Sequence, residues 1–152
     1  MNAFTVMMRG HEGLNPDIHV QFDADDDILD FSAKFSRIHA ALKPYLIDAV
    51  QKNAEEGVGV VRPLFFYYDE KEAYNNGHEY LLGRDILVAP VLRPKASKRQ
   101  VYLPDDNWIH LWSQKEYKGG VYEVDAPLGE IPVFVRKDAK SDVLNRLLKE
   151  IK

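Results

Sequence analysis

The longest regular pattern of hydrophobic positions lies between residues 28 and 56. Three aspartates at 25–27 stand just before it, where carboxylates favour a helix N-terminus, and Gly57 follows it, as glycine does at a helix C-cap. Pro44 falls inside the segment and predicts either a kink or the start of a second helix. Apolar residues recur at intervals of three and four, which predicts a helix with one apolar stripe: Ile28, Phe31, Phe35, Ile38, Leu42, Tyr45, Leu46, Ala49 and Val50.

The hydrophobic pattern changes from about residue 60 to residue 136, where short β-branched and aromatic runs alternate with turn residues. Turn sequences such as YNNGH, PDDN and KGG separate the runs. Several short strands at this spacing predict an antiparallel β-sandwich. In the second run we expect Arg84 and Asp85 to pair locally. The six runs are VVRPLFFYY, DILVAPVL, KRQVYLP, WIHLW, VYEVDAP and IPVFVR.

Each end of the chain adds one more element. Phe4 to Met8 is apolar on successive positions, which is typical of a strand buried on both faces, and a polar loop follows it to about Asp27. Near the other end Ser141 is a candidate N-cap for a terminal helix docked on the sheet. The apolar face of that helix consists of Val143, Leu144, Leu147, Leu148 and Ile151.

Composition narrows the classes of function. The chain has 152 residues, of which 45% are hydrophobic and 29% charged, and this is typical of one globular domain. Its net charge of −4, without a basic stripe, argues against a nucleic-acid partner. No apolar run reaches the roughly 18 residues of a membrane span. The lack of cysteine and of a visible signal peptide fits a reducing compartment, so we expect a cytoplasmic protein.

Eight sequence blocks occur in an order that resembles a known enzyme family. They are MRGHEG, QFD, IHAALKPYL, RPLF, YLLGRDILVAPVL, VYLPDDNWIHLW, YKGG and APLGEIPVFVR. Together they resemble the C-terminal part of glycoside hydrolase family 31, which contains α-glucosidases and α-xylosidases, over about residues 3–137. The resemblance implies a mixed α and β fold. Residues 1–57 would be the last strand, loop and helix of a (β/α)₈ barrel, 58–137 a proximal β-sandwich, and 138–152 a terminal helix.

The resemblance also implies a role for the loop after the first apolar run. Active sites of such barrels lie at the C-terminal ends of the strands. His11 matches the histidine of the family's R-x-H pattern, which donates a hydrogen bond to sugar hydroxyls. Arg9 matches the arginine of that pattern, which orients nearby carboxylates. Glu12 has no role in the pattern, and we interpret it as a solvated loop carboxylate.

The resemblance places the two catalytic carboxylates outside this chain. Family members use one aspartate as nucleophile and another as acid/base, both upstream of the matched blocks. The consecutive carboxylates of Asp23 to Asp27 cannot face each other across a sugar at about 5 Å. We therefore expect a fragment with no catalytic residue of its own, inactive alone, with no cofactor and no metal site.

The substrate and the alternative function follow from smaller features. The stretch HEG-NP…QFD looks most like the bacterial branch that contains sulfoquinovosidases, so the expected substrate is an α-linked glucoside or sulfoquinovoside. The alternative is a stand-alone carbohydrate-binding or interaction module, with Trp108 and Trp112 on one face of a strand, although core packing is favoured for both. The helix stripe would pack against a barrel. If no barrel is present, the stripe must be covered by the sandwich or by a second copy of the chain. We therefore expect self-association through an exposed helix face.

Overall fold

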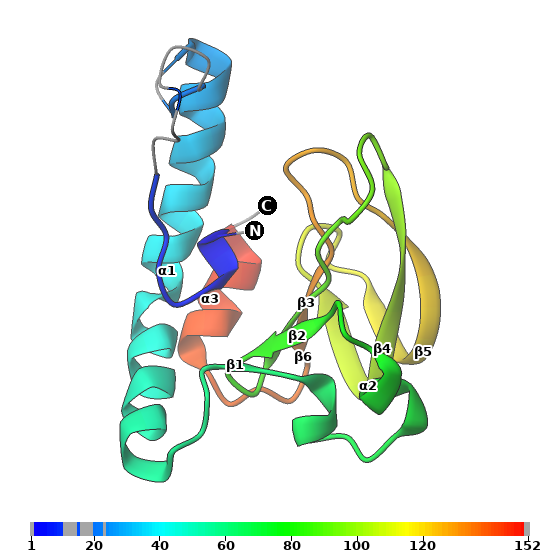
Figure 1. Cartoon of the computed structure of the whole chain (residues 1–152). Coiled ribbons are helices and arrows are strands. Elements are labelled where there is room, and N and C mark those ends of the chain that lie inside the picture. Colours follow the sequence, from blue (N-terminus) through cyan, green and yellow to red (C-terminus); the bar gives the residue numbers. More distant parts are fainter. Residues whose placement is uncertain (1, 11–14, 16–19, 23, 151–152) are drawn as a thin grey trace.

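A helical layer lies beside a curved antiparallel sheet in the computed structural model, which describes residues 2–10, 15, 20–22 and 24–150 (Figure 1). The long helix α1 (Asp26–Glu56) and the terminal helix α3 (Asp142–Glu150) pack against each other on one side of the sheet. The short 3-10 helix η1 (Asn2–Phe4) also contacts α1. Within the described ranges, no helix is both long enough and apolar enough to cross a bilayer.

Helix α1 begins and ends as its sequence predicts. The side chain of Asp25 accepts a hydrogen bond from the Ile28 N–H at 2.8 Å, and Gly57 closes the helix at φ 71°. The predicted second helix after Pro44 is wrong, because α1 runs through this residue without interruption. The proline removes only the hydrogen bond to the carbonyl of Ala40, an exposed residue where water can replace it.

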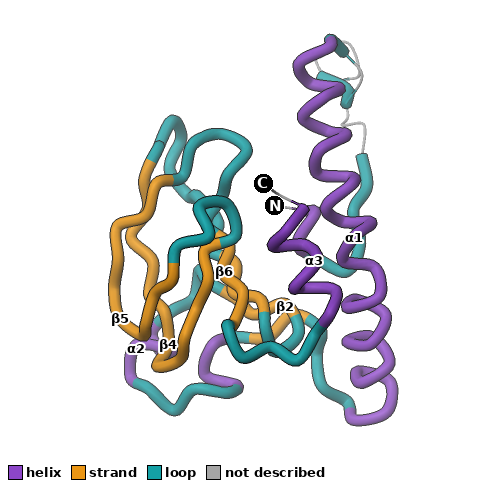
Figure 2. The backbone as a smooth tube through the Cα atoms, turned by 180° about the vertical axis from the view of Figure 1, so that it is seen from behind, coloured by secondary structure: helices purple, strands orange, loops and turns teal. Residues whose placement is uncertain are grey.

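In the part of the chain that the structure describes, six strands form one antiparallel sheet in the order β1-β2-β3-β6-β4-β5. Figure 2 shows β4 and β5 as a long curved hairpin at one edge. The antiparallel pairing agrees with the predicted β-sandwich, although the described strands form one curved sheet rather than two. The 3-10 helix η3 (Leu64–Phe66) and helix α2 (Lys71–Asn75) lie in the connection between β1 and β2. The strands are β1 (Val61–Arg62), β2 (Tyr80–Leu82), β3 (Ile86–Val88), β4 (Lys98–His110), β5 (Glu116–Asp125) and β6 (Val133–Arg136).

Several predictions for the β region need correction. The predicted turn KGG (118–120) is wrong, because it lies inside β5, and β2 falls in none of the six predicted runs. The run at 60–68 gives only the two-residue strand β1, because Pro63 has no N–H for a ladder and the chain turns into η3 after it. The runs at 98–104 and 108–112 are one strand up to His110, with a register shift between Leu103 and Asn107. The irregularity bends β4, so that its first half pairs with β5 while Trp108 to His110 also pair with β6.

The central strands β2, β3 and β6 are buried on both faces, and each face has its own core. On β3, Ile86 and Val88 face the helices, whereas Leu87 faces the opposite core. The predicted stripe of α1 packs into the helix-side core, so the sheet and α3 supply the surface that it needs. Its buried members are Phe35, Ile38, Leu42, Tyr45, Leu46 and Ala49.

Of the two elements predicted near the ends of the chain, the structure confirms one. The terminal helix is confirmed as α3, and the hydroxyl oxygen of Ser141 accepts a hydrogen bond from the Leu144 N–H at 3.4 Å. The predicted strand from Phe4 to Met8 is wrong, because η1 and an irregular segment stand there. A parallel strand needs neighbours on both sides for its backbone hydrogen bonds, and no other strand lies beside these residues within the described ranges.

Candidate functional site

The segment that was predicted to bind sugar follows η1. Arg9 is exposed, and its side chain makes no hydrogen bond or ion pair with the described part of the chain. His11 and Glu12 lie outside the described residues. Beside Arg9, the backbone of Gly10 lies close to the ring of Phe22, since a Cβ at position 10 would be 3.4 Å from that ring. Gly10 and Phe22, which lies just before α1, are therefore neighbours.

The start of this segment is anchored in the helix-side core. Phe4 is fully buried, and its ring meets that of Trp112 edge-on at 6.5 Å between centroids. Its carbonyl accepts a hydrogen bond from the Tyr80 hydroxyl at 3.0 Å, and the carbonyl of Ala3 accepts one from Nδ1 of His39 at 3.0 Å. These contacts fix the point from which the chain leads to Arg9. His39 itself is half-buried.

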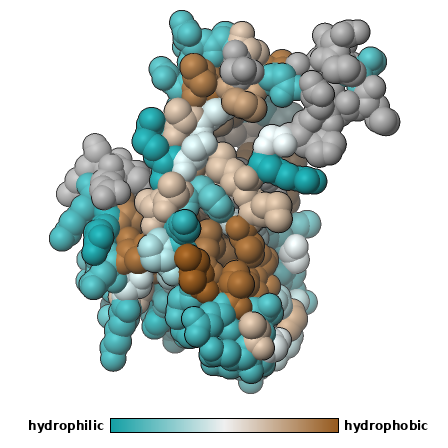
Figure 3. All heavy atoms as spheres, turned by 90° about the vertical axis from the view of Figure 1, so that its left-hand side faces the viewer, coloured by the Kyte–Doolittle hydropathy of each residue, from teal (hydrophilic) through white to brown (hydrophobic). Residues whose placement is uncertain are grey.

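An apolar groove runs along the outer side of α1, next to the segment that carries Arg9. It has a volume of about 550 Å³ and is lined by Val6, His39, Ala40, Lys43, Leu46, Ile47, Val50, Gln51 and Ala54. Ile47 is 55% exposed and Val50 is 42% exposed, although both are aliphatic. Figure 3 shows apolar side chains gathered in one patch on this side of the molecule. We call this surface the α1 groove. It adjoins the buried stripe and shares Leu46 with it, so the apolar surface of α1 is wider than the part that the sheet and α3 cover.

The motif LLGRD meets α1 at Tyr45. The Tyr45 hydroxyl donates to the carbonyl of Leu82 at 2.9 Å and accepts from the N–H groups of Arg84 and Asp85 at 3.1 and 3.0 Å. Burial raises the pKa of Tyr45 to about 12. Gly83 adopts φ +63°, and a Cβ there would overlap the hydroxyl. This motif therefore joins the long helix to the sheet.

A charged network ties the same motif to the last strand. Nε and Nη2 of Arg136 donate to Oδ1 of Asp85 at 2.9 and 2.7 Å. The predicted local pair of Arg84 with Asp85 is therefore wrong. Arg84 instead donates to the Tyr68 hydroxyl at 2.9 Å, and that hydroxyl donates to Asp106 at 3.1 Å. The reason is the antiparallel pairing of β3 with β6, which brings position 136 beside position 85.

The two tryptophans do not form a sugar platform. Trp108 is fully buried in the core opposite the helices, where its Nε1 donates to the carbonyl of Pro104 at 3.0 Å. Trp112 is half-buried in the helix-side core and donates to the carbonyl of Ile131 at 2.7 Å. The prediction of a shared face is wrong because β4 ends at His110 and a turn follows. The preferred prediction, core packing, is confirmed for both.

Two hollows lie close to the end of β4. One, of about 630 Å³, has His110, Trp112, Tyr117 and Asp125 among its lining residues. His110 is 5% exposed, its Nδ1 is 2.8 Å from the Ser113 hydroxyl oxygen, and burial lowers its pKa to about 4. The described residues hold no cluster of His, Cys, Asp or Glu that could bind a metal ion.

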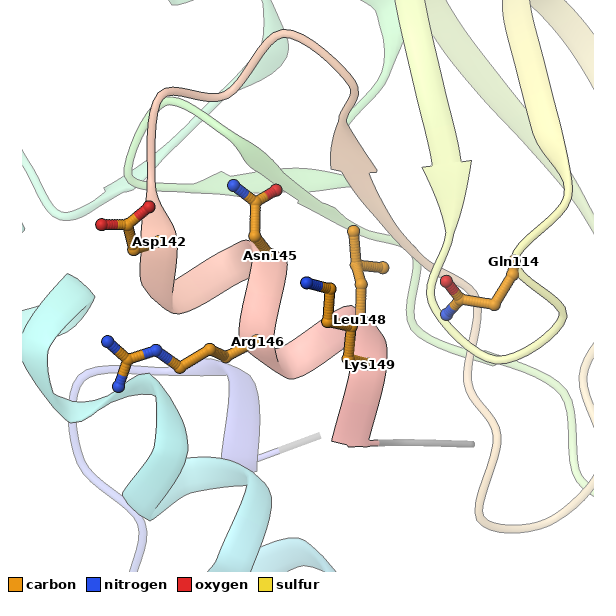
Figure 4. A pocket seen from close by; sticks show the side chains of 6 residues that line it. All are labelled: Gln114, Asp142, Asn145, Arg146, Leu148 and Lys149. Carbon is orange, nitrogen blue, oxygen red and sulfur yellow. The ribbon is translucent and has the colours of Figure 1, made fainter.

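The other hollow, of about 570 Å³, lies between α3 and the turn after β4. Figure 4 shows that Asp142 and Arg146 extend away from Gln114, toward α1. Its polar groups therefore do not converge on one point, as the groups of a catalytic or binding centre would.

The sequence did not predict the contacts that join the LLGRD motif to α1 and to β6. Tyr45 reads as one more apolar member of the helix stripe, and Asp85 and Arg136 are 51 residues apart. The only sequence signal for them is the joint presence of the blocks that contain LLGRD and VFVR.

Comparison with known proteins identifies the same region. The family model for the glycosyl hydrolase family 31 C-terminal domain matches residues 57–139. The chain is 46% identical over 151 residues to the sulfoquinovosidase of Escherichia coli, and the match covers 99% of this chain and 22% of that enzyme. It is 34% identical over 106 residues to α-glucosidase 2 of Bacillus thermoamyloliquefaciens, which covers 68% of the chain and 14% of that enzyme.

A solved structure that is similar to this chain belongs to the same family as the two sequence matches. It is a family 31 sulfoquinovosidase from E. rectale in complex with the aza-sugar inhibitor IFGSQ. It superposes with a TM-score of 0.92 at 41% identity, over 98% of this chain and 22% of that one. The chain thus spans about a fifth of the length of the relatives that it matches.

Proposed function

The chain belongs to glycoside hydrolase family 31, and we propose that it serves as the C-terminal part of a retaining α-glycosidase. In this proposal it completes the sugar-binding end of a barrel and supplies neither catalytic carboxylate. The observation that carries the proposal is a 46% identity that extends over 99% of this chain but only 22% of a sulfoquinovosidase. Hydrolysis with retention needs two carboxyl groups about 5 Å apart across the bond, so the chain alone should be inactive.

The sugar contact in this proposal is made by the segment that contains Arg9 and His11. The residues just before it are fixed by the buried ring of Phe4 and by the Tyr80 hydrogen bond. Arg9 is exposed and unpaired within the described residues, so its guanidinium is available to orient carboxylates of a neighbouring part of the enzyme. His11 would donate a hydrogen bond to a hydroxyl of the sugar in the cleaved subsite.

The proposed substrate is an α-linked sulfoquinovoside, with an α-linked glucoside as the broader class. The support comes from relatives: a sulfoquinovosidase is 46% identical over nearly the whole chain, whereas an α-glucosidase is 34% identical over 68% of it. The residues that would recognise a sulfonate are expected to lie outside this chain. The assignment to a sulfoquinovoside therefore rests on the whole-chain similarity.

The α1 groove has a role in the same proposal. In the intact enzyme α1 would be the last barrel helix, with its inner stripe on the sandwich and α3 and its outer groove on the rest of the barrel. The exposed aliphatic side chains of Ile47 and Val50 support this, because such residues are costly to leave in water. When the chain is isolated, the uncovered groove should favour self-association.

The sugar contact is tested by kinetics of the enzyme that contains this chain. His11→Ala should lower kcat/KM on aryl α-glycosides about ten- to a hundredfold, because a hydrogen bond that tightens as charge builds on the sugar is lost. Glu12→Gln is the matched control, and its rates should stay within a few-fold. Near-wild-type kinetics for His11→Ala would contradict the subsite assignment, as would a large effect of Glu12→Gln alone.

A further inference from the structure

A cavity of about 400 Å³ with basic walls lies beside the start of β4, on the β region rather than on the helices. Its basic lining residues are His78, Arg93, Lys98 and Arg99, and aliphatic side chains such as Leu92 complete the wall. Among the described strands, the first half of β4 pairs with β5 alone, and the cavity lies beside this half of the strand. This cavity shares no lining residue with the α1 groove, and a ligand bound there would not depend on the proposed glycosidase activity.

Arg99 is a charged residue in a position that normally takes an apolar one. It lies on the same face of β4 as Val101 and Leu103, both fully buried, and its side chain is 12% exposed. Its only ion pair within the described residues is a long one, 3.4 Å from Nη2 to Oε1 of Glu79. A buried guanidinium with five N–H donors is therefore poorly paired.

The partner carboxylate is already occupied by other donors. Glu79 accepts hydrogen bonds from Nδ2 of Asn76 at 2.8 Å and from the N–H of Tyr102 at 3.2 Å. The Nη1 atom of Arg99 is buried and has no hydrogen-bond partner among the described residues. Burial also lowers the pKa of Arg99, which is what an insufficiently compensated cation shows.

Of the other two basic residues considered in the cavity, one is paired with a carboxylate and one is not. Lys98 pairs with Glu123 at 3.1 Å, and both side chains are more than half exposed. Arg93 is exposed and forms no ion pair with any described residue. An anion in the cavity would thus lie beside Arg93 and Arg99, which both line it.

We propose that this cavity binds a small oxyanion, a phosphate or a sulfonate, through Arg93 and Arg99, with His78 as a further donor. Tetrahedral oxyanions match the fork of an arginine side chain and accept several hydrogen bonds at once. The cavity is larger than an inorganic ion and has an aliphatic wall beside its basic one. It can therefore hold the anion together with a short organic group.

The test is an NMR titration of the arginine side-chain nitrogens in the whole chain. The probes are inorganic phosphate and methanesulfonate, and sodium chloride at equal ionic strength is the reference. We expect saturable shifts at Arg93 and Arg99 with at least one probe. Saturation by phosphate alone would identify a phosphate site, by methanesulfonate alone a sulfonate site, and by both a site for the shared oxyanion group.

Two variants test whether the oxyanion binds in this cavity. Arg93→Gln should weaken binding about tenfold, because one charge-assisted contact is lost. Arg37→Gln makes the same change at an exposed position on α1 and should leave the dissociation constant within twofold. Chloride producing equal shifts, the absence of saturation, or unchanged affinity in Arg93→Gln would overturn the proposal. Because Arg93 is exposed, its variant is expected to keep the thermal unfolding midpoint of the parent chain.

Discussion

The hydroxyl of Tyr45 lies where a side chain at position 83 would stand. Gly83 has φ +63°, and an added Cβ would be 2.8 Å from the Cζ atom of Tyr45 and closer still to its oxygen. Because no side chain is present, the hydroxyl reaches the turn and bonds to backbone atoms of Leu82, Arg84 and Asp85. The lack of a side chain at Gly83 thus allows Tyr45 to connect α1 to the turn between β2 and β3.

Gly83→Ala should therefore lower the free energy of unfolding by about 3 kcal/mol or more, the sum of a left-handed backbone and a steric overlap. Gly57→Ala is the matched control, since Gly57 has φ +71° but nothing within 4 Å of an added Cβ. It should cost only about 1 kcal/mol. Urea unfolding measures both, and equal losses in the two variants would show that contact with Tyr45 is unimportant.

The ion pair of Asp85 with Arg136 should contribute more than a surface pair. Its side chains are 15% and 21% exposed, so Asp85→Asn leaves a mostly buried guanidinium underpaired and should cost about 2 kcal/mol. Asp48→Asn is the control, because the Asp48–Lys52 pair is more than half exposed on both sides and should contribute less than about 0.5 kcal/mol. Similar unfolding free energies for the two variants would contradict this assignment.

His110 should make stability depend on pH in the acidic range. Burial lowers its pKa from 6.5 to about 4, so the unfolded chain takes up the proton first as the pH falls. The stability is complete above pH 6.5 and is lost between 6.5 and 4, by about 3 kcal/mol. His110→Gln should flatten this part of the profile in urea unfolding, whereas His78→Gln, at an exposed position, should not. A wild-type slope in His110→Gln would rule out His110 as the cause.

The α1 groove predicts the behaviour of the isolated chain at high concentration. The uncovered aliphatic side chains should produce concentration-dependent self-association in sedimentation velocity. Ile47→Lys puts a charge into the groove at a position that is 55% exposed, so it should shift the chain toward monomer without unfolding it. A clean monomer for the unmodified chain at high concentration would contradict the prediction.

The sequence was sufficient for elements whose stability is local. The three-and-four spacing of α1, its Asp25 and Gly57 caps, and the Ser141 cap of α3 act over one helical turn, and all are found. The hydrophobic runs likewise located β3, β6 and the second half of β5, although KGG, predicted as a turn, lies inside β5.

The errors concern residues whose state depends on distant partners. Phe4 to Met8 has the composition of a buried strand but lies beside no other strand in the described chain, so it remains irregular. Trp108 and Trp112 have the spacing of one strand face, yet the chain turns between them. Asp85 pairs across the sheet with Arg136 rather than with its neighbour, because strand pairing rather than sequence distance decides the contact. His11 stays a prediction from motif resemblance.

In the proposed function, this chain completes an α-glycosidase without forming the active site by itself. The most direct measurement replaces the matching region of the E. coli sulfoquinovosidase, 46% identical over 151 residues, with this chain and assays an aryl α-sulfoquinovoside. The chimaera should fold and hydrolyse the substrate, while this chain alone and the truncated enzyme alone should show no turnover. Turnover by the isolated chain, or a folded chimaera without activity, would contradict the account.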